Sequence, residues 1–358
     1  MQTIVYRRSL DFNSGAGQLI AMQVRGLRAA GYDVQLACQR GALRFFLQSG
    51  LRASRVTING IDRFRSMPGR WIIDHGMELP QANTVFSHNL MTEAAVYLQR
   101  PEIAAAADRE RSFFDKLNAS ALIVANSQLV KQAILEHFGL PESRLSVCYP
   151  GYRSEIFNLQ QRDRLRDAAR SQLGLDKDVP LVGFVTSGDL HKRGLAIFLD
   201  AATAILAANP RTRFLIVGSK QLPSWANSHP LLASGALIHQ PKGRTPAKWM
   251  SALDVFLYPA RFEEFGMVVI EACALGVPVL TSRRVGASEV LTSQYDRWIC
   301  AEPDANQLAE RALELLGNPA FQALLADAGL QSVTPLGGDH YARRSVELIC
   351  NQISRCLV

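Results

Sequence analysis

The stretch RFEEFGMVVIEACALGVPVL, residues 261–280, places two carboxylates eight positions apart in an otherwise apolar segment. Glu263 precedes a Phe-Gly pair, and Glu271 lies inside the run MVVIEACAL. A carboxylate in such a run is costly to bury without a partner. Carboxylate oxygens accept hydrogen bonds from sugar hydroxyls, and one carboxylate can accept from both hydroxyls of a vicinal diol such as a ribose. The pattern therefore favours a site for a polyhydroxylated ligand, the alternative being two solvated glutamates.

The residues between the two carboxylates predict a helix that begins near Gly266. The run VFLYPA before it reads as a strand, so residues 261–265 form a loop at the carboxyl end of that strand. The first N–H groups of a helix lack intrahelical acceptors and attract anions. Glycine also lets a ligand approach the backbone closely. We therefore expect Phe265, Gly266 and Met267 to contact the ligand through their backbone.

A pair of cations precedes another predicted helix, in the stretch TSGDLHKRGLAIFLDAA. Lys192 and Arg193 lie where a positive charge opposes the helix dipole, which is unfavourable unless an anion is bound nearby. Arginine offers a planar fork of donors and lysine a point charge, and both bind phosphate groups. Both residues are candidates for an anion site, with a solvated helix start as the alternative.

Strand-like and helix-like runs alternate along the chain, which predicts parallel sheets wrapped by helices. The alternation stops at a polar, Arg-rich stretch, residues 159–180, and then starts again. We expect two Rossmann-like doubly wound α/β domains that face each other across a cleft. Their predicted ranges are 1–156 and 157–335, with a C-terminal helix in 336–358 that packs back toward the first domain. Ligands of such sheets bind beyond the carboxyl ends of the strands.

Two features of the first domain follow predicted strands. The loop NSGAGQ opens a helix, and its Gly15, Ala16 and Gly17 only weakly resemble a dinucleotide fingerprint, because no acidic residue ends the second strand. His88, in TVFSHNL, ends a strand at the edge where ligands bind. A buried core histidine is the alternative interpretation.

These motifs together resemble a known family. The run EEFGMVVIEACALGVPVLTSRRVGASEVL is similar to the signature of the retaining GT-B glycosyltransferases of glycosyl transferases group 1, which includes lipopolysaccharide-core and capsule enzymes. That signature is a Glu, seven residues, a second Glu, then Gly-x-Pro-Val and a Gly-rich loop that ends in Glu. The resemblance extends over about residues 121–301 and departs from the family pattern at Arg153, where the family has Asp, at Val285, where it has Gly, and at Arg193, where it has Lys.

The resemblance implies a role for each candidate residue. Glu271 would hold the ribose of a nucleotide-sugar, and Glu263 with the backbone of 265–267 would hold the sugar. Lys192 and Arg193 would bind the pyrophosphate, without a metal. Residues 15–17 would contact the donor phosphate or the acceptor, and His88 would contact the transferred sugar or the acceptor.

The implied activity is transfer of a sugar from a UDP- or GDP-sugar to a hydroxyl of a glycan or lipid-linked acceptor. The implied setting is the synthesis of bacterial cell-surface polysaccharide or lipopolysaccharide. Two other classes stay open: a GT-B sugar-nucleotide epimerase, which needs no acceptor, and a basic nucleic-acid-binding protein. The second is less favoured, because stacking motifs are missing from the sequence.

The formal net charge of +7 is concentrated near the N-terminus, since residues 1–100 hold 12 arginines, no lysine and six acidic residues. The N-terminus lacks the layout of a signal peptide, so we expect a cytoplasmic protein. One segment interleaves basic and aromatic residues, which suggests docking on the anionic inner face of the inner membrane. The segment contains Arg40, Arg44, Arg52, Arg55, Arg63, Arg65 and Arg70 together with Phe45, Phe46, Phe64 and Trp71. An ordinary arginine-rich surface is the alternative.

Overall fold

The computed structural model describes residues 2–56, 69–241, 243 and 246–357. The chain divides into two compact units, Met1–Gly151 with Asp339–Val358, and Tyr152–Gly338. The division falls a few residues from the expected boundaries, because the Tyr152 N–H donates to the Leu336 carbonyl at 3.3 Å and so ties this residue to the second unit.

The first unit is built on a parallel sheet in the order β3-β2-β1-β4-β5-β6-β7. Strand β4 was not anticipated from the sequence, and it pairs with β1 at the centre of the sheet. The strands are β1 (Gln2–Tyr6), β2 (Asp33–Cys38), β3 (Ala53–Arg55), β4 (Arg70–Asp74), β5 (Thr84–Ser87), β6 (Leu122–Ala125) and β7 (Leu145–Val147).

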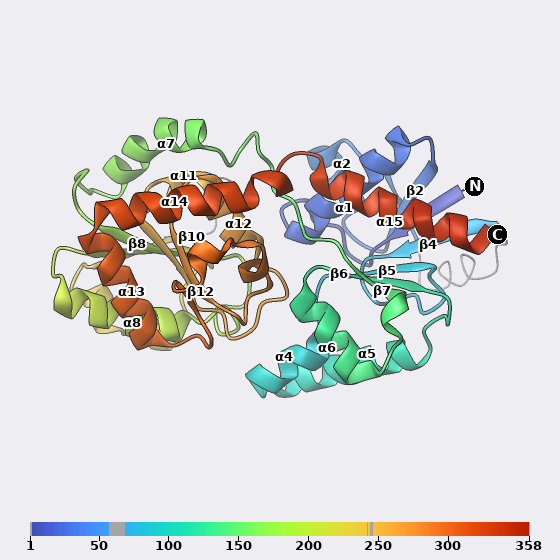
Figure 1. Ribbon diagram of the computed structural model, residues 1–358, viewed down its shortest axis with the longest axis horizontal. Coiled ribbons are helices and arrows are strands. Elements are labelled where there is room, and N and C mark those ends of the chain that lie inside the picture. The colour runs from blue at the N-terminus through green and yellow to red at the C-terminus, as the bar shows by residue number, and fades with distance from the viewer. Residues whose placement is uncertain (1, 57–68, 242, 244–245, 358) are drawn as a thin grey trace. The chain divides into compact units, whose positions relative to one another are not determined.

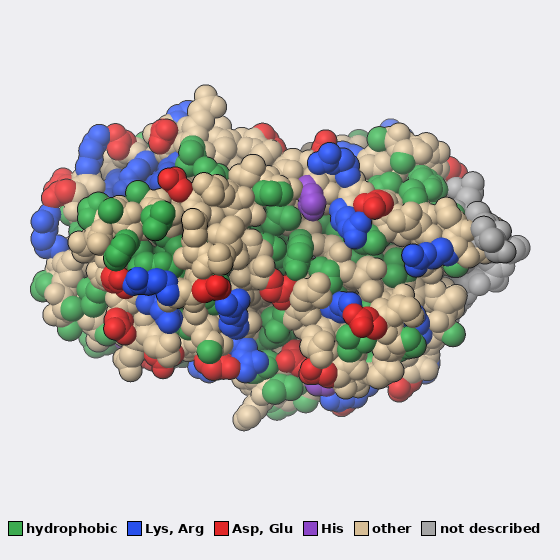
Figure 2. Space-filling model, in the orientation of Figure 1, with side chains coloured by type: hydrophobic (Ala, Val, Ile, Leu, Met, Phe, Trp, Pro, Cys, Tyr) green, Lys and Arg blue, Asp and Glu red, His purple; other side chains and the backbone are tan. Residues whose placement is uncertain are grey.

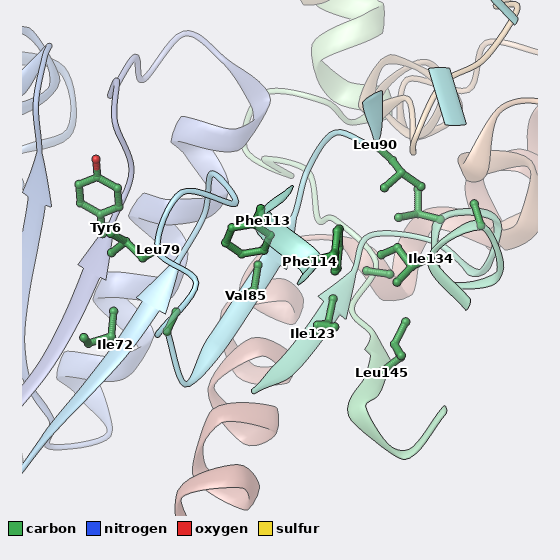
Figure 3. Packing of buried hydrophobic residues seen from close by; sticks show 14 of the residues in the cluster. Tyr6, Ile72, Leu79, Val85, Leu90, Phe113, Phe114, Ile123, Ile134 and Leu145 are labelled. Carbon is green, nitrogen blue, oxygen red and sulfur yellow. The ribbon is translucent and has the colours of Figure 1, made fainter. Parts of the chain in front are cut away.

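Helices cover both faces of this sheet (Figure 1). On one side lie α1 (Gly15–Ala29), α2 (Ala42–Ser49) and α15 (His340–Leu357), and on the other α4 (Met91–Leu98), α5 (Pro101–Asp115) and α6 (Gln128–Phe138). Helix α15 packs on α1. Figure 3 shows the core between the sheet and α5, where Phe113 and Phe114 meet Val85 and Ile123. Buried aliphatic and aromatic side chains of this kind supply most of the stabilisation of such a layer.

The second unit is built on a parallel sheet in the order β10-β9-β8-β11-β12-β13. Its strands are β8 (Leu181–Val185), β9 (Arg213–Gly218), β10 (Leu237–Pro241), β11 (Val255–Tyr258), β12 (Val279–Ser282) and β13 (Ile299–Cys300). Its helices are α7 (Leu159–Gln172), α8 (Leu195–Ala208), α9 (Ser224–Asn227), α10 (Pro230–Ala233), α11 (Pro246–Ser251), α12 (Met267–Ala274), α13 (Ala305–Gly317) and α14 (Pro319–Val333). Both units are thus doubly wound α/β domains, as predicted.

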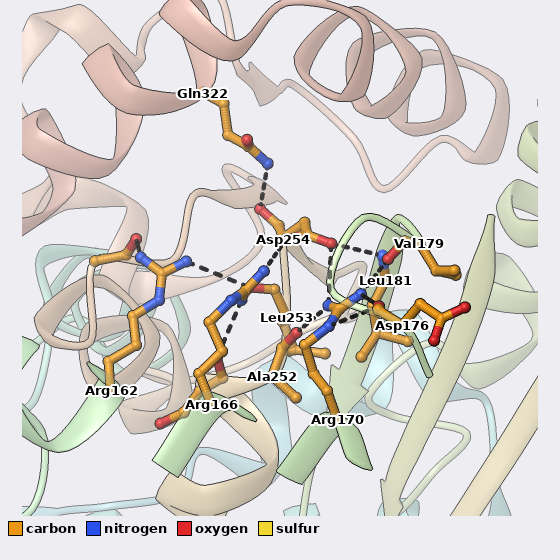
Figure 4. Close-up of polar contacts among 12 residues, drawn as sticks. Arg162, Arg166, Arg170, Asp176, Val179, Leu181, Ala252, Leu253, Asp254 and Gln322 are labelled. Carbon is orange, nitrogen blue, oxygen red and sulfur yellow. Dashed lines mark hydrogen bonds and ion pairs between the residues drawn. The ribbon is translucent and has the colours of Figure 1, made fainter. Parts of the chain in front are cut away.

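Helix α7 occupies the Arg-rich stretch that looked like a linker in the sequence. Arg162, Arg166 and Arg170 are four residues apart and therefore share one face of the helix. They donate to the backbone carbonyls of Gly276, Leu253 and Ala252 at 2.6, 2.9 and 2.8 Å (Figure 4). The Asp254 carboxylate joins this cluster and accepts from the Leu181 N–H at 2.8 Å. The cluster fixes the amino ends of β8 and β11, whose carboxyl ends carry the candidate site.

Charged side chains of both signs are interspersed on the face of the molecule in Figure 2. The positive side chains on this face therefore do not form a continuous stripe. Within the described residues, no helix is long and apolar enough to cross a membrane.

Candidate active site

The candidate site of the second unit is assembled by loops that follow β8, β11 and β12. Backbone hydrogen bonds join these loops to one another. The Glu263 N–H donates to the Arg284 carbonyl at 2.9 Å, and the Gly286 N–H donates back to the Glu263 carbonyl at 3.0 Å. The Arg261 N–H donates to the Lys192 carbonyl at 2.9 Å. The sequence-predicted residues Lys192, Arg193 and Glu263 are therefore held in one rigid group of loops.

Two glycines permit this close approach. Gly194 has φ +79°, and a Cβ there would lie 1.9 Å from the Pro259 carbonyl oxygen. Gly266 has φ +93° and caps the start of α12, as the sequence predicted. Both are left-handed conformations that side chains rarely adopt. Helix α12 can begin where it does because Gly266 turns the chain after Glu263.

Arg193 and Glu263 form an ion pair in which both side chains are largely buried. The Tyr258 hydroxyl, from the end of β11, donates to Glu263 Oε2 at 3.0 Å. Burial raises the pKa of Tyr258, so this hydroxyl stays protonated and continues to donate. The Arg193 guanidinium lies against Gly188, where a Cβ would be 2.9 Å from Nε. Glu263 is thus oriented from two sides.

Lys192 pairs with Glu264, a residue that the sequence reasoning passed over. Lys192 Nζ lies 2.7 Å from both Glu264 oxygens, and the two side chains are 10% and 2% exposed. Burial lowers the pKa of Lys192. Burial would raise the pKa of Glu264, but the charges of Lys192 and Arg193 outweigh it and hold the pKa below its usual range. The ammonium group of Lys192, which was expected to bind the pyrophosphate, is therefore paired with the Glu264 carboxylate.

Glu271 lies in α12, half-buried, on the helix that begins at Gly266. Burial raises the pKa of this carboxyl to about 8, although the Arg153 guanidinium acts in the opposite direction. Among the described residues, its carboxyl makes no hydrogen bond or ion pair, in contrast to Glu263 and Glu264. The positive charge of Arg153, a position where the family has Asp, therefore offsets part of the rise in the pKa of Glu271.

The first unit contains the other sequence-predicted residues. Gly15, Ala16 and Gly17 open α1, and the Ser14 side chain caps the helix by accepting from the Gly17 N–H at 3.1 Å. A Cβ at Gly17 would lie 1.9 Å from the Asp11 carbonyl oxygen, so this position requires glycine. The conformation of this loop is therefore fixed by the Ser14–Gly17 hydrogen bond and by the close approach of Gly17 to the Asp11 carbonyl.

His88 follows β5 directly and belongs to a chain of hydrogen-bonded side chains. Its Nε2 lies 2.8 Å from His75 Nδ1, and His75 Nε2 lies 2.8 Å from Gln23 Oε1. Burial lowers the pKa of His88 to about 3 and that of His75 well below its usual value. Both rings are therefore neutral at physiological pH. The sequence reasoning found His88 but not His75 or Gln23, which come from β4's end and α1.

A pocket of about 570 Å³ lies beside His88 in the first unit. It is found at the carboxyl ends of β1, β4 and β5 and is bordered by α5, with His75, His88, Arg7 and Arg109 among its lining residues. Of its lining residues the sequence analysis had singled out only His88, because they come from four separate parts of the chain.

Solved structures of known proteins have a similar fold. WaaG, described as a glycosyltransferase involved in lipopolysaccharide biosynthesis, superposes with a TM-score of 0.78 over 97% of this chain and 99% of its own, at 17% identity. Anabaena Alr3699/HepE in complex with UDP and glucose gives 0.76 over 98% and 99%, at 16% identity. The fold is that of the GT-B glycosyltransferases, with two parallel-sheet α/β domains.

The second unit can be assigned more closely. Residues 166–331, most of this unit, match the family described as Glycosyl transferases group 1. A D-inositol 3-phosphate glycosyltransferase from Nocardioides sp. is 26% identical over 252 residues, which are 65% of this chain and 54% of the relative. The chain spans about half the length of the curated relatives it matches first.

Proposed function

We propose that this chain is a retaining glycosyltransferase that moves a sugar from a nucleotide-diphosphate sugar to an acceptor hydroxyl. The observation that carries the proposal is the Glu271 carboxyl, which is half-buried and has no hydrogen-bond partner among the described residues. It lies on α12, inside the stretch that matches the glycosyl transferases group 1 domain. A ribose diol would supply the hydrogen bonds that this carboxyl lacks. Retention is supported by the resemblance of the two-glutamate motif.

Arg193 and the first turn of α12 would stabilise the leaving diphosphate. Transfer passes through an oxocarbenium-like state at the anomeric carbon, and the leaving group gains negative charge as its bond breaks. Fixed donors aimed at developing charge lower the barrier without reorganisation. Glu263 would hold a sugar hydroxyl while it orients Arg193. Lys192, enclosed by Glu264, would hold the loop of Arg193 in place.

The substrate classes are part of the proposal. A UDP-sugar or GDP-sugar donor is supported by the similar fold of Alr3699/HepE, whose structure contains UDP and glucose. A glycan or glycolipid acceptor in bacterial cell-surface synthesis is supported by the similar fold of WaaG. The reaction would take place in the cytoplasm, at the inner face of the membrane.

A thermal-shift panel of UDP-, GDP- and ADP-sugars tests the donor. A nucleotide-sugar present at 100 times its Kd should stabilise the folded chain by about 2.7 kcal/mol. Arg193→Ala should lose most of the shift caused by the nucleotide-sugar but little of that caused by the bare nucleoside, because only the diphosphate contacts Arg193. If none of the nucleotide-sugars raises the melting temperature, the proposal is contradicted. Release of a free sugar-nucleotide isomer without acceptor would identify an epimerase instead.

Membrane docking is proposed for α2. Leu43 and Leu47 are 72% and 74% exposed on this helix, and Phe46 lies on the same side. Arg44, Arg52 and the neighbouring arginines of this segment are exposed around them. An exposed apolar helix face flanked by arginines is typical of helices that lie on anionic membranes. The aromatic residues Phe45 and Trp71 are buried and take no part, which corrects the expectation, while Arg63, Phe64 and Arg65 lie outside the described residues.

Replacing Leu43 and Leu47 together with Gln should weaken sedimentation with vesicles that contain anionic lipid. Each leucine that leaves the interface costs about 1 kcal/mol or more, and each arginine near the surface contributes about 1 kcal/mol. The matched control is Leu324→Gln, since Leu324 is 57% exposed on α14 of the other unit. Binding that ignores lipid charge, or that both variants weaken equally, would count against α2 as the docking helix.

A further inference from the structure

We propose that one water molecule is bound inside the first unit, where it bridges Tyr341 of α15 to Asn126, the residue that follows β6. A small cavity lies at this place, between α1, the first turn of α15 and the carboxyl ends of β5, β6 and β7. Its lining residues include Leu19, His88, Asn126, Cys148 and Tyr341. The chain re-enters the first unit at Asp339, so the water fastens the beginning of the returning helix to the sheet.

Among the described residues, two buried polar atoms of this lining have no hydrogen-bond partner. Tyr341 is 1% exposed, and one of the two atoms is its hydroxyl oxygen. Asn126 is 8% exposed, and the other atom is its Oδ1. Buried polar groups in folded proteins are nearly always paired, either with other protein groups or with ordered water. Two such atoms in one cavity therefore indicate a small polar ligand between them.

The orientation of the Asn126 amide is fixed by its other contact. Its Nδ2 donates to the His88 carbonyl at 3.4 Å, and Oδ1 cannot take this place because a carbonyl oxygen does not donate. Oδ1 can only accept a hydrogen bond, whereas the Tyr341 hydroxyl can donate or accept. A single water supplies both missing bonds, since it donates a proton to Asn126 Oδ1 and accepts the hydroxyl proton of Tyr341.

The size of the cavity and its remaining lining also fit one water. The space open to the centre of a water molecule is about 10 Å³, close to the smallest volume that holds one water. A sugar, a phosphate or a hydrated metal ion is too large for this space. The Cys148 thiol also lines the cavity, and burial raises its pKa to about 12, so it stays protonated and is a weak third partner. Burial raises the pKa of Tyr341 well above its usual value, which keeps the hydroxyl neutral.

A high-resolution crystal structure of the full-length chain tests the site directly. We expect electron density for a water within hydrogen-bonding distance of both Tyr341 Oη and Asn126 Oδ1. A cavity without this density would overturn the proposal.

Tyr341→Phe removes only the hydroxyl and tests the same site in solution. If the hydroxyl is bonded to the water, the melting temperature should fall by roughly 2–4 °C, the shift expected for one lost hydrogen bond in a unit of this size. A hydroxyl that is buried without a partner is unfavourable, so its removal would leave the melting temperature unchanged or raise it. Either of these two results would count against the water.

A double-variant cycle tests the bridge between the two residues. Asn126→Ala and Tyr341→Phe each break the bridge, so the double variant should lose less stability than the two single variants together. The matched control is Tyr32→Phe, because the Tyr32 hydroxyl contacts Cys350 of the same helix at 3.1 Å but Tyr32 does not line the cavity. The loss caused by this control should add fully to that of Asn126→Ala. Full additivity for Tyr341→Phe as well would refute the bridge, and since no substrate enters these measurements, their outcome is independent of the proposed function.

Discussion

Replacing Lys192 by Met should lower the free energy of unfolding by about 3–5 kcal/mol, because the buried Glu264 carboxylate then loses the cation that both of its oxygens contact. The Lys192 and Glu264 side chains are 10% and 2% exposed, so water cannot replace the lost partner. The double variant Lys192→Met with Glu264→Leu should recover most of this loss, since a buried pair replaced by apolar side chains of similar volume leaves no unpaired charge. Urea unfolding of both variants measures the difference.

The control for this prediction is an exposed pair in the same unit. Lys177 and Asp167 lie 2.5 Å apart with side chains 81% and 63% exposed. Lys177→Met should leave the unfolding transition unchanged, because exposed pairs contribute little. Equal destabilisation by Lys177→Met and Lys192→Met would contradict the role given to the buried pair.

The same double variant separates two roles of Lys192. If Lys192 only positions the loop of Arg193, the double variant retains turnover once its stability is restored. If Lys192 contacts the leaving diphosphate, as the sequence resemblance implied, the double variant is stable but slow, because stabilisation of the developing charge is lost. The geometry favours the first outcome, since both Glu264 oxygens already contact Lys192 Nζ.

The fold could be predicted because local patterns decide it. Alternating strand-like and helix-like runs, and Gly266 before the run from Met267, follow from residue type and short spacing alone. Helix α7 could not be found this way, because three arginines lie on the face that packs against the rest of the unit. Arg170 is 1% exposed, and backbone carbonyls far along the chain take the place of an apolar core. Apolar residues at helical spacing are the sequence pattern that indicates a helix, and α7 lacks a clear pattern of this kind.

The candidate site could be predicted only as a set of residues. The run RFEEFG contains two adjacent glutamates, and spacing does not tell which cation each one meets. The pairing of Lys192 with Glu264 and Arg193 with Glu263 depends on how the loops after β8 and β11 are joined by backbone hydrogen bonds. Of the pocket of the first unit only His88 was found, for the same reason, since its residues meet only through the order of the strands.

Glu271→Gln should weaken nucleotide binding and at the same time stabilise the free protein at alkaline pH. A charged hydrogen-bond partner of the ribose contributes about 1–3 kcal/mol, so the nucleotide Kd should rise roughly 5- to 150-fold. Glu310→Gln is the control, because Glu310 is exposed on α13 of the same unit. Titration of UDP and GDP against the three proteins measures this effect.

The stability effect has the opposite sign because burial raises the pKa of Glu271 to about 8. The folded state therefore binds this proton more tightly than the unfolded state, so the contribution of Glu271 to stability is present at acidic pH and is lost as the pH rises through 8. Gln cannot ionise and avoids that loss, so the melting temperature of Glu271→Gln should exceed that of the wild type by a margin that grows up to about pH 8 and is constant above it. Nucleotide affinity of the wild type should rise over the same range, because the ionised carboxylate accepts from both ribose hydroxyls. A folded variant with the stability change but unchanged nucleotide affinity would show that Glu271 is only a buried acid and not the ribose ligand.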